Sequence, residues 1–144
     1  MAAHHPLPRR QLLVAVAAVA VGGAVGTLLR VVALRIDSTR WFVELVGTSG
    51  WATHVPWILA LINVVGVYFA AAALNGLLLR RGPNDLGRLV IITGFFGGLT
   101  SYSSLFVSVG AIWHVSVWGA VFTVLCAVLS GVGAAWLGTR TWSR

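Results

Sequence analysis

Three long runs without a charged side chain limit what this sequence can fold into. They cover residues 12–29, 55–79 and 89–139. A helix that crosses a bilayer needs about 20 mostly apolar residues, so the first two runs allow one crossing each and the third allows two. Only 9% of the residues are charged, whereas about a quarter are charged in a typical soluble domain. The sequence therefore predicts an all-α membrane protein.

Four membrane-spanning helices are expected, within a single transmembrane domain that covers residues 1–144. Their expected bounds are about residues 11–34, 56–79, 86–112 and 115–138. The first stretch follows two arginines, as a signal peptide would, but it is too long for the apolar part of a signal peptide, and we expect it to be retained. Residues 40–46 in the first loop are expected to form a short interfacial helix.

The net charge is +7, and all ten basic residues are arginines. Seven of them fall in the N-terminal segment, the second loop and the C-terminal segment, and three lie near the first loop. The seven are Arg9, Arg10, Arg80, Arg81, Arg88, Arg140 and Arg144, and the three are Arg30, Arg35 and Arg40. Cytoplasmic loops are enriched in arginine and lysine. We therefore expect a protein of the cell membrane with both termini in the cytoplasm, and no nucleic-acid partner.

The stretch GFFGGLTSYSSLF, residues 94–106, is unusual for the middle of a membrane helix. Gly97 and Gly98 weaken a helix, and the hydroxyl residues that follow favour caps over helix interiors. We expect one helix to end near Gly97 and a new one to begin with an N-cap at Thr100 or Ser101. Irregular backbone at this depth is tolerated only inside protein or beside a cavity, and the ends of two half-helices present charges of opposite sign to ions. The alternative is a glycine-rich packing notch whose hydroxyls bond back to their own helix; the density of these features favours an ion site.

Two polar residues add to this hypothesis. Asn63 lies within the second stretch, where its amide either bonds a neighbouring helix or donates to an anion. Arg30 ends the first stretch, where it either extends to the lipid headgroups or faces a water-filled vestibule. The acidic residues all fall in loops: Asp37, Glu44 and Asp85. Proton-coupled transporters usually need a carboxylate within the membrane, so the sequence favours passive transport, and no enzyme is expected.

Three motifs resemble those of the CrcB/Fluc family of fluoride channels, in an order and spacing that cover nearly the whole chain. They are GGAVGTLLR (22–30), LINVVG (61–66) and GFFGGLTSYSSL (94–105), of which the last is the most specific. The resemblance implies a passive fluoride-selective channel that exports fluoride from the cytoplasm and relieves its toxicity. It also implies an antiparallel, dual-topology-type dimer of four-helix subunits with a broken third helix and two fluoride pathways at the interface.

The resemblance further implies individual site residues. The candidates for the fluoride pathway, with Arg30 added as a possible vestibule residue, are Asn63, Tyr102, Ser103, Ser104, Leu105 and Arg30. A structural Na⁺ at the third-helix break would be held by the backbone carbonyls of Gly97 and Thr100. Two positions depart from the family pattern, because Tyr102 and Leu105 stand where phenylalanines are expected. Leucine has no electropositive ring edge for an anion, and the adjacent Phe106 points about 100° round the helix.

The arginine distribution also bears on the partner. A seven-to-three split favours one orientation in the membrane, so an antiparallel dimer would need an oppositely oriented homologue. A heterodimer is thus at least as expected as a homodimer. Two alternatives remain: a non-conducting partner subunit of such a channel, and a small multidrug-type exporter. The exporter should carry a carboxylate in its first helix, which this chain lacks.

Overall fold

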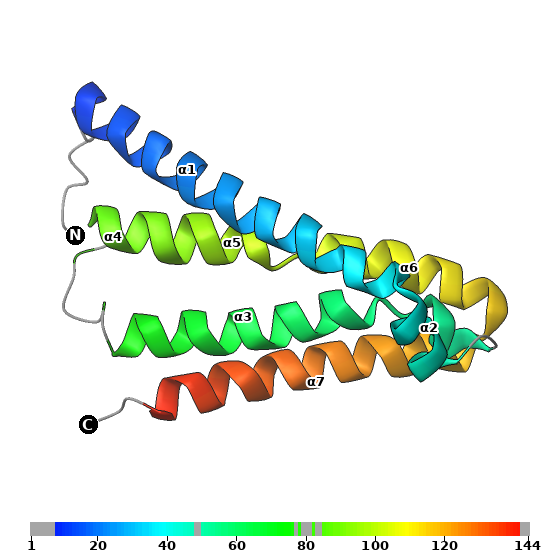
Figure 1. Cartoon of the computed structure of the whole chain (residues 1–144). Helices are drawn as coiled ribbons and strands as arrows, with labels where there is room; N and C mark the ends of the chain where they lie inside the picture. The colour runs from blue at the N-terminus through cyan, green and yellow to red at the C-terminus, as the bar shows by residue number, and fades with distance from the viewer. Residues whose placement is uncertain (1–7, 48–49, 77, 79–81, 83–84, 142–144) are drawn as a thin grey trace.

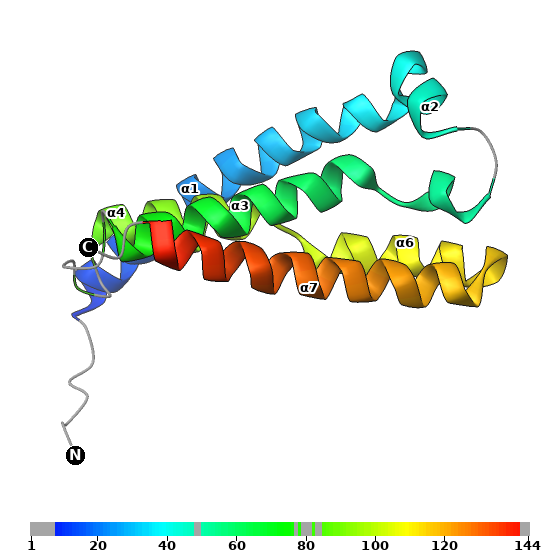
Figure 2. The ribbon, with the colours of Figure 1, turned by 90° about the horizontal axis from the view of Figure 1, so that it is seen from below.

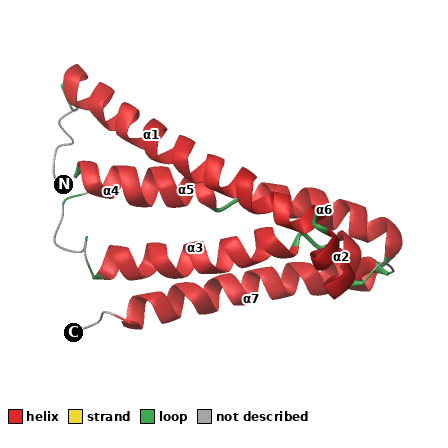
Figure 3. Cartoon of the chain, in the orientation of Figure 1, coloured by secondary structure: helices red, strands yellow, loops and turns green. Residues whose placement is uncertain are grey.

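We describe residues 8–47, 50–76, 78, 82 and 85–141 of a computed structural model. Every regular element in this part of the chain is helical (Figure 3). The long helices are α1 (Arg9–Leu34), α3 (Trp57–Asn75) and α7 (Val117–Thr141). The third long stretch consists of α4 (Leu86–Arg88), a π-helical segment η3 (Leu89–Phe96), α5 (Gly97–Leu99) and α6 (Tyr102–Val115). The first loop holds η1 (Arg35–Ser38), α2 (Arg40–Val46) and η2 (Trp51–His54).

Four helical stretches are long and apolar enough to cross a membrane, as the sequence predicts. They cover residues 9–38, 57–75, 86–115 and 117–141. The chain is therefore a multi-pass membrane protein, and the short helix predicted at residues 40–46 is present as α2.

Some of the predicted helix bounds are wrong by a few residues. The second helix was expected to reach residue 79, which lies outside the described residues, but α3 ends at Asn75 and Gly76 follows as its C-cap. The third stretch continues to Val115, and an extended Ser116 separates it from α7. The Ser116 hydroxyl accepts a hydrogen bond from the Gly119 amide (3.1 Å), so it caps the new helix. At the other end, α7 continues to Thr141, where its hydroxyl and that of Tyr68 on α3 lie 3.1 Å apart.

The helices form two groups. In one, α1 packs along η3 and α5; in the other, α7 packs against both α3 and α6 (Figures 1 and 2). The start of α1 and the end of α7 lie at the same end of the bundle, and α2 lies at the opposite end (Figure 1). This agrees with an even number of crossings.

Glycines allow α1 to approach the third helical stretch very closely. Gly22 and Gly26 on α1 face backbone atoms of Val90 and Phe95, and a Cβ at either glycine would overlap with a carbonyl oxygen there. Gly98 faces the backbone of α1 in the same way. Two helices that both carry small residues four positions apart can bring their backbones into contact without a side chain between them. The packing role expected for the first-helix glycines is therefore present.

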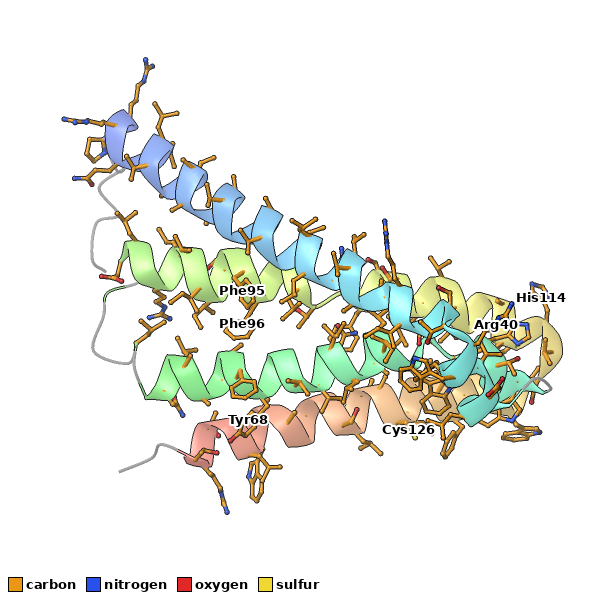
Figure 4. The ribbon with its side chains drawn as sticks, in the orientation of Figure 1. Arg40, Tyr68, Phe95, Phe96, His114 and Cys126 are labelled. Carbon is orange, nitrogen blue, oxygen red and sulfur yellow. The ribbon has the colours of Figure 1, made fainter. Side chains whose placement is uncertain are left out.

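The described arginines are divided between the two ends of the bundle. Arg9, Arg10, Arg88 and Arg140 belong to the end that holds the start of α1 and the end of α7, while Arg30 and Arg35 lie toward the opposite end of the bundle. Arg40 lies in α2 at that opposite end (Figure 4). The remaining arginines of the predicted cytoplasmic side lie outside the described residues: Arg80, Arg81 and Arg144. The outer helix faces expose large apolar side chains, such as Val107 and Trp118 (77% and 83% exposed), as expected where lipid or another subunit covers them.

Candidate functional site

The third helical stretch is interrupted near its middle. Thr100 (φ −87°, ψ 140°) and Ser101 (φ −150°, ψ 104°) are extended, and α6 begins at the next residue. Ser101 is the N-cap of α6, since its hydroxyl accepts a hydrogen bond from the Ser104 amide (3.4 Å). The predicted break and the predicted N-cap are thus confirmed.

The first half-helix ends two residues later than predicted. Gly97 keeps helical dihedral angles (φ −63°, ψ −37°), and the helix continues to Leu99. The reason is the contact with α1: Gly98 packs onto the carbonyl group of Gly23, where any side chain would overlap with it. The glycine pair therefore permits close packing in the last turn, and the chain leaves the helix only afterwards.

Asn63 holds the broken segment against α3 through two hydrogen bonds to one residue. Its Oδ1 accepts from the Ser101 amide (2.8 Å), and its Nδ2 donates to the Ser101 carbonyl (3.2 Å). Asn63 is only 3% exposed, so in the membrane these polar groups satisfy each other. An asparagine amide has two N–H donors, and one of them remains available after this pairing. We call this pair of bonds the Asn63 clasp.

A group of hydroxyls follows the clasp. The Ser101 Oγ lies 3.1 Å from the Oγ of Ser103 and 3.1 Å from that of Ser104. Thr100 behaves differently, because its hydroxyl donates back to the Phe96 carbonyl (2.8 Å). The structure therefore brings Asn63, Ser103 and Ser104 to the same break, and it shows one hydroxyl in the back-bonded state that the packing alternative describes.

The carbonyl groups at the break suit a hard cation. Of the backbone hydrogen bonds outside the regular helices of the described chain, none ends on the carbonyl of Gly97 or Thr100. Carbonyl oxygens are typical ligands of hard metal ions. The described residues contain no cluster of His, Cys, Asp and Glu side chains that could hold a metal, so a cation at this place would depend on backbone and hydroxyl oxygens. A Thr27 hydroxyl on α1, which the sequence did not single out, donates to the Gly98 carbonyl (3.4 Å).

The two positions that depart from the expected phenylalanines have different surroundings. Tyr102 is 39% exposed and lies against Gly131 on α7. Leu105 is 3% exposed, so its side chain lies inside the subunit, whereas Phe106 is 59% exposed. The adjacent leucine and phenylalanine thus occupy different faces of α6, as predicted.

Arg30 lies apart from this group. It is half-buried on α1, one turn before the end of the helix. Among the described residues, no hydrogen bond or ion pair joins it to the break. Its candidate role in the pathway therefore has no contact to support it within one subunit.

An apolar cavity of about 470 Å³ lies beside the break, between α3 and η3. Tyr68, Phe95 and Phe96 are among its lining residues (Figure 4). Gly66 and Leu99 also line it, and the Thr100 methyl group lies against Gly66. Leu99 and the Thr100 methyl group thus place apolar surface directly beside the break.

Comparison with known proteins identifies the family. A family model described as "CrcB-like protein, Camphor Resistance (CrcB)" matches residues 17–139, which include α3, the broken third stretch and most of α1 and α7. The chain belongs to the CrcB family. Within this family, it is 36% identical over 141 residues to the "Fluoride-specific ion channel FluC 1" of Cutibacterium acnes, covering 91% of this chain and 85% of the relative.

Two further CrcB relatives cover similar shares. The "Fluoride-specific ion channel FluC" of Variovorax paradoxus is 31% identical over 90% of this chain and 95% of its own length. The protein of the same name from Mesorhizobium japonicum is 31% identical over 83% of this chain and 89% of its own length. The resemblance seen in the three motifs is confirmed, and the family is one of ion channels and not of enzymes. The match also argues against the multidrug-type exporter.

Proposed function

We propose that this CrcB protein is a passive fluoride-selective channel that exports fluoride from the cytoplasm and relieves fluoride toxicity. The observation that carries this proposal is the Asn63 clasp, because it fixes a break lined by hydroxyls in the middle of a membrane helix. The names of the relatives, all fluoride-specific ion channels, supply the identity of the ion. In this proposal residues 1–144 form one four-helix subunit.

The chemistry of fluoride explains why such a site needs donors. A small anion is strongly hydrated, and a pore must replace that water with hydrogen-bond donors. The second N–H of the Asn63 amide and the hydroxyls of Ser103 and Ser104 are suitable donors. Chloride is larger, so a narrow path between close-packed helices discriminates against it.

A passive mechanism also fits the charges of the chain. The neutral acid form of fluoride crosses a bilayer and loses its proton at cytoplasmic pH, so the anion accumulates inside. The inside-negative membrane potential then drives it out through a pore, at about 2.3 kcal/mol per charge per 100 mV. Glu44 and Asp85 lie outside the four long stretches, and Asp37 lies in η1, in the last turn of the first stretch. None of the three lies in the middle of a stretch, which suits transport without proton coupling.

A Na⁺ ion at the break is part of the proposal. The carbonyls of Gly97 and Thr100 would hold it, and their freedom from the hydrogen bonds around the break supports this assignment. The ion would supply a positive charge that favours an anion nearby. Two helices hold the backbone on either side of this site. Thr27 on α1 donates a hydrogen bond to the Gly98 carbonyl, and Asn63 on α3 accepts one from the Ser101 amide.

We further propose an antiparallel dimer in the cell membrane, with both termini of this subunit in the cytoplasm. The seven-to-three split of the arginines in the sequence supports this orientation. If this chain inserts in one orientation only, its partner in an antiparallel dimer is a homologue of the opposite orientation. If the chain inserts in both orientations, the partner is a second copy of the same chain. The burial of Leu105 favours a second candidate function, a non-conducting subunit whose partner provides the complete pathway.

Flux from liposomes tests the proposal. The chain is reconstituted alone and together with an oppositely oriented homologue, and fluoride and chloride efflux are compared with an ion-selective electrode. We expect fluoride efflux far above chloride efflux in at least one preparation. Asn63→Asp in this chain should reduce the flux; an unchanged flux from the mixed preparation would indicate the non-conducting subunit. No fluoride efflux in either preparation would refute the channel function.

A further inference from the structure

The side chain of Tyr102 reaches α7 at one particular residue. Its hydroxyl oxygen is the atom nearest to the point where a side chain on Gly131 would begin, and a Cβ placed there would overlap with it. The next nearest atom, Cζ of the same ring, is 3.7 Å from that point, an ordinary van der Waals distance. Gly131 is buried, although Tyr102 is 39% exposed. The hydroxyl therefore occupies its present place because residue 131 has no side chain.

The hydroxyl groups of α7 itself are already used within that helix. Each donates to a carbonyl oxygen three or four residues earlier: Thr123, Ser130, Thr139 and Thr141. The Tyr102 hydroxyl, in contrast, makes no hydrogen bond with any other described residue. It is thus an O–H donor at the contact between α6 and α7 that remains available to a ligand.

The position of this donor relates it to the break. Tyr102 is the first residue of α6 and directly follows Ser101, which Asn63 holds. The residue after it is Ser103, whose hydroxyl lies 3.1 Å from that of Ser101. A phenolic O–H and a serine O–H both form strong hydrogen bonds with an anion.

We propose that Gly131 is a positioning residue that holds the Tyr102 hydroxyl beside the break, where the hydroxyl donates a hydrogen bond to the conducted anion. The inference rests on the proposed channel function and extends it. It gives Tyr102 a hydrogen bond to the anion through its hydroxyl, in addition to the electropositive ring edge that a phenylalanine would also offer. Gly131 contributes by the absence of a side chain and makes no contact with the anion.

Four variants test the coupling between the two residues in a fluoride flux assay. Tyr102→Phe removes the donor, and we expect the flux to fall by a factor of about 10 to 150, since a hydrogen bond to a charged group is usually worth about 1.5–3 kcal/mol and about 1.4 kcal/mol is a factor of ten. Gly131→Ala displaces the hydroxyl and should cause a similar loss. In a protein that already carries Tyr102→Phe, Gly131→Ala should cause no further loss of flux. Without the hydroxyl, the nearest ring atom is Cζ, which lies 3.7 Å from the added Cβ and so does not overlap with it. Gly133→Ala is the matched control, since an added Cβ there meets nothing within 4 Å.

A second measurement reports on Tyr102 without any flux. The chain contains two tyrosines, so protein labelled with 3-fluorotyrosine gives two ¹⁹F resonances, and Tyr68→Phe identifies which is which. Gly131→Ala should move the Tyr102 resonance, and Gly133→Ala should not. Added fluoride, but not added chloride, should move the Tyr102 resonance of the unmodified protein.

The two measurements separate the possible failures. Equal flux losses from Gly131→Ala with and without Tyr102→Phe would overturn the inference, as would a Tyr102 resonance that Gly131→Ala leaves in place. Absence of fluoride flux from the unmodified protein, alone and with a partner, would overturn the channel function instead. In that case the resonance of the Gly131→Ala protein still decides whether residue 131 sets the position of Tyr102.

Discussion

Replacing Asn63 with leucine removes both bonds of the Asn63 clasp while keeping a side chain of similar size. The amide and the carbonyl of Ser101 then lose their partner in the membrane interior. Interhelical hydrogen bonds in membranes contribute about 0.6 kcal/mol on average and up to about 1.7 kcal/mol each. For two bonds, we expect the free energy of unfolding to fall by about 1 to 3 kcal/mol. Because the extended segment is no longer fixed, fluoride flux should fall more steeply than stability.

The assay combines unfolding and transport. Unfolding in detergent is followed by the fluorescence of the seven tryptophans, and flux is measured in liposomes. Asn75→Leu is the matched control, because Asn75 is the same residue type on the same helix. Its Nδ2 donates to the Thr139 carbonyl of α7 (3.0 Å), away from the break. We expect Asn75→Leu to lower stability by about half as much, since one bond is lost, and to leave the flux unchanged.

Two results would refute this reasoning. If Asn63→Leu left both stability and flux intact, the clasp would not hold the break. If Asn75→Leu reduced the flux as strongly as Asn63→Leu, the effect would come from loss of contact between helices in general. A flux loss specific to Asn63 supports the role of the clasp.

Three further predictions follow from the geometry of the break. Ser101→Ala removes the N-cap of α6 and should lower stability by about 1 kcal/mol in thermal unfolding, whereas Ser101→Thr, which keeps the hydroxyl, should behave like the unmodified protein. Gly98→Ala forces a side chain against the α1 backbone and should lower the free energy of unfolding by about 1–3 kcal/mol. Gly23→Ala is the control and should lower it much less, because its Cβ would lie 3.8 Å from the nearest atom. Equal losses from the two variants would contradict the assigned packing. Replacing Na⁺ by a large organic cation on both sides of the liposome membrane should reduce fluoride flux, and a flux independent of the cation would argue against the sodium site.

Much of the fold could be predicted because the membrane imposes simple requirements. The uncharged runs specify four crossings, and their lengths place the helices to within a few residues. The break was also visible, since glycines next to hydroxyl residues are rare in an uninterrupted membrane helix. The exact end of the first half-helix was not predictable, because it depends on the packing of Gly98 against α1, a contact between residues 71–75 positions apart in the chain.

The sequence allowed us to predict which residues belong to the candidate site, but not which atoms those residues contact. The sequence indicated that the Asn63 amide needs a hydrogen-bond partner, yet that partner is the backbone of Ser101, which no side-chain pattern reports. The contact between Gly131 and Tyr102 was missed for a similar reason, since a glycine in an apolar helix has no distinguishing chemistry. Leu105 was placed in the pathway by its position in a motif, and only the folded chain shows that it is buried.

The two halves of the third helical stretch are attached to different neighbours. The first half, η3 and α5, packs on α1, whereas α6 packs on α7. The break is therefore the joint between two groups of helices, and Asn63 on α3 spans that joint. When helices tilt to match a thinner or thicker bilayer, the angle between the groups changes and the joint must absorb it. We therefore expect lipid chain length to affect the geometry of the break.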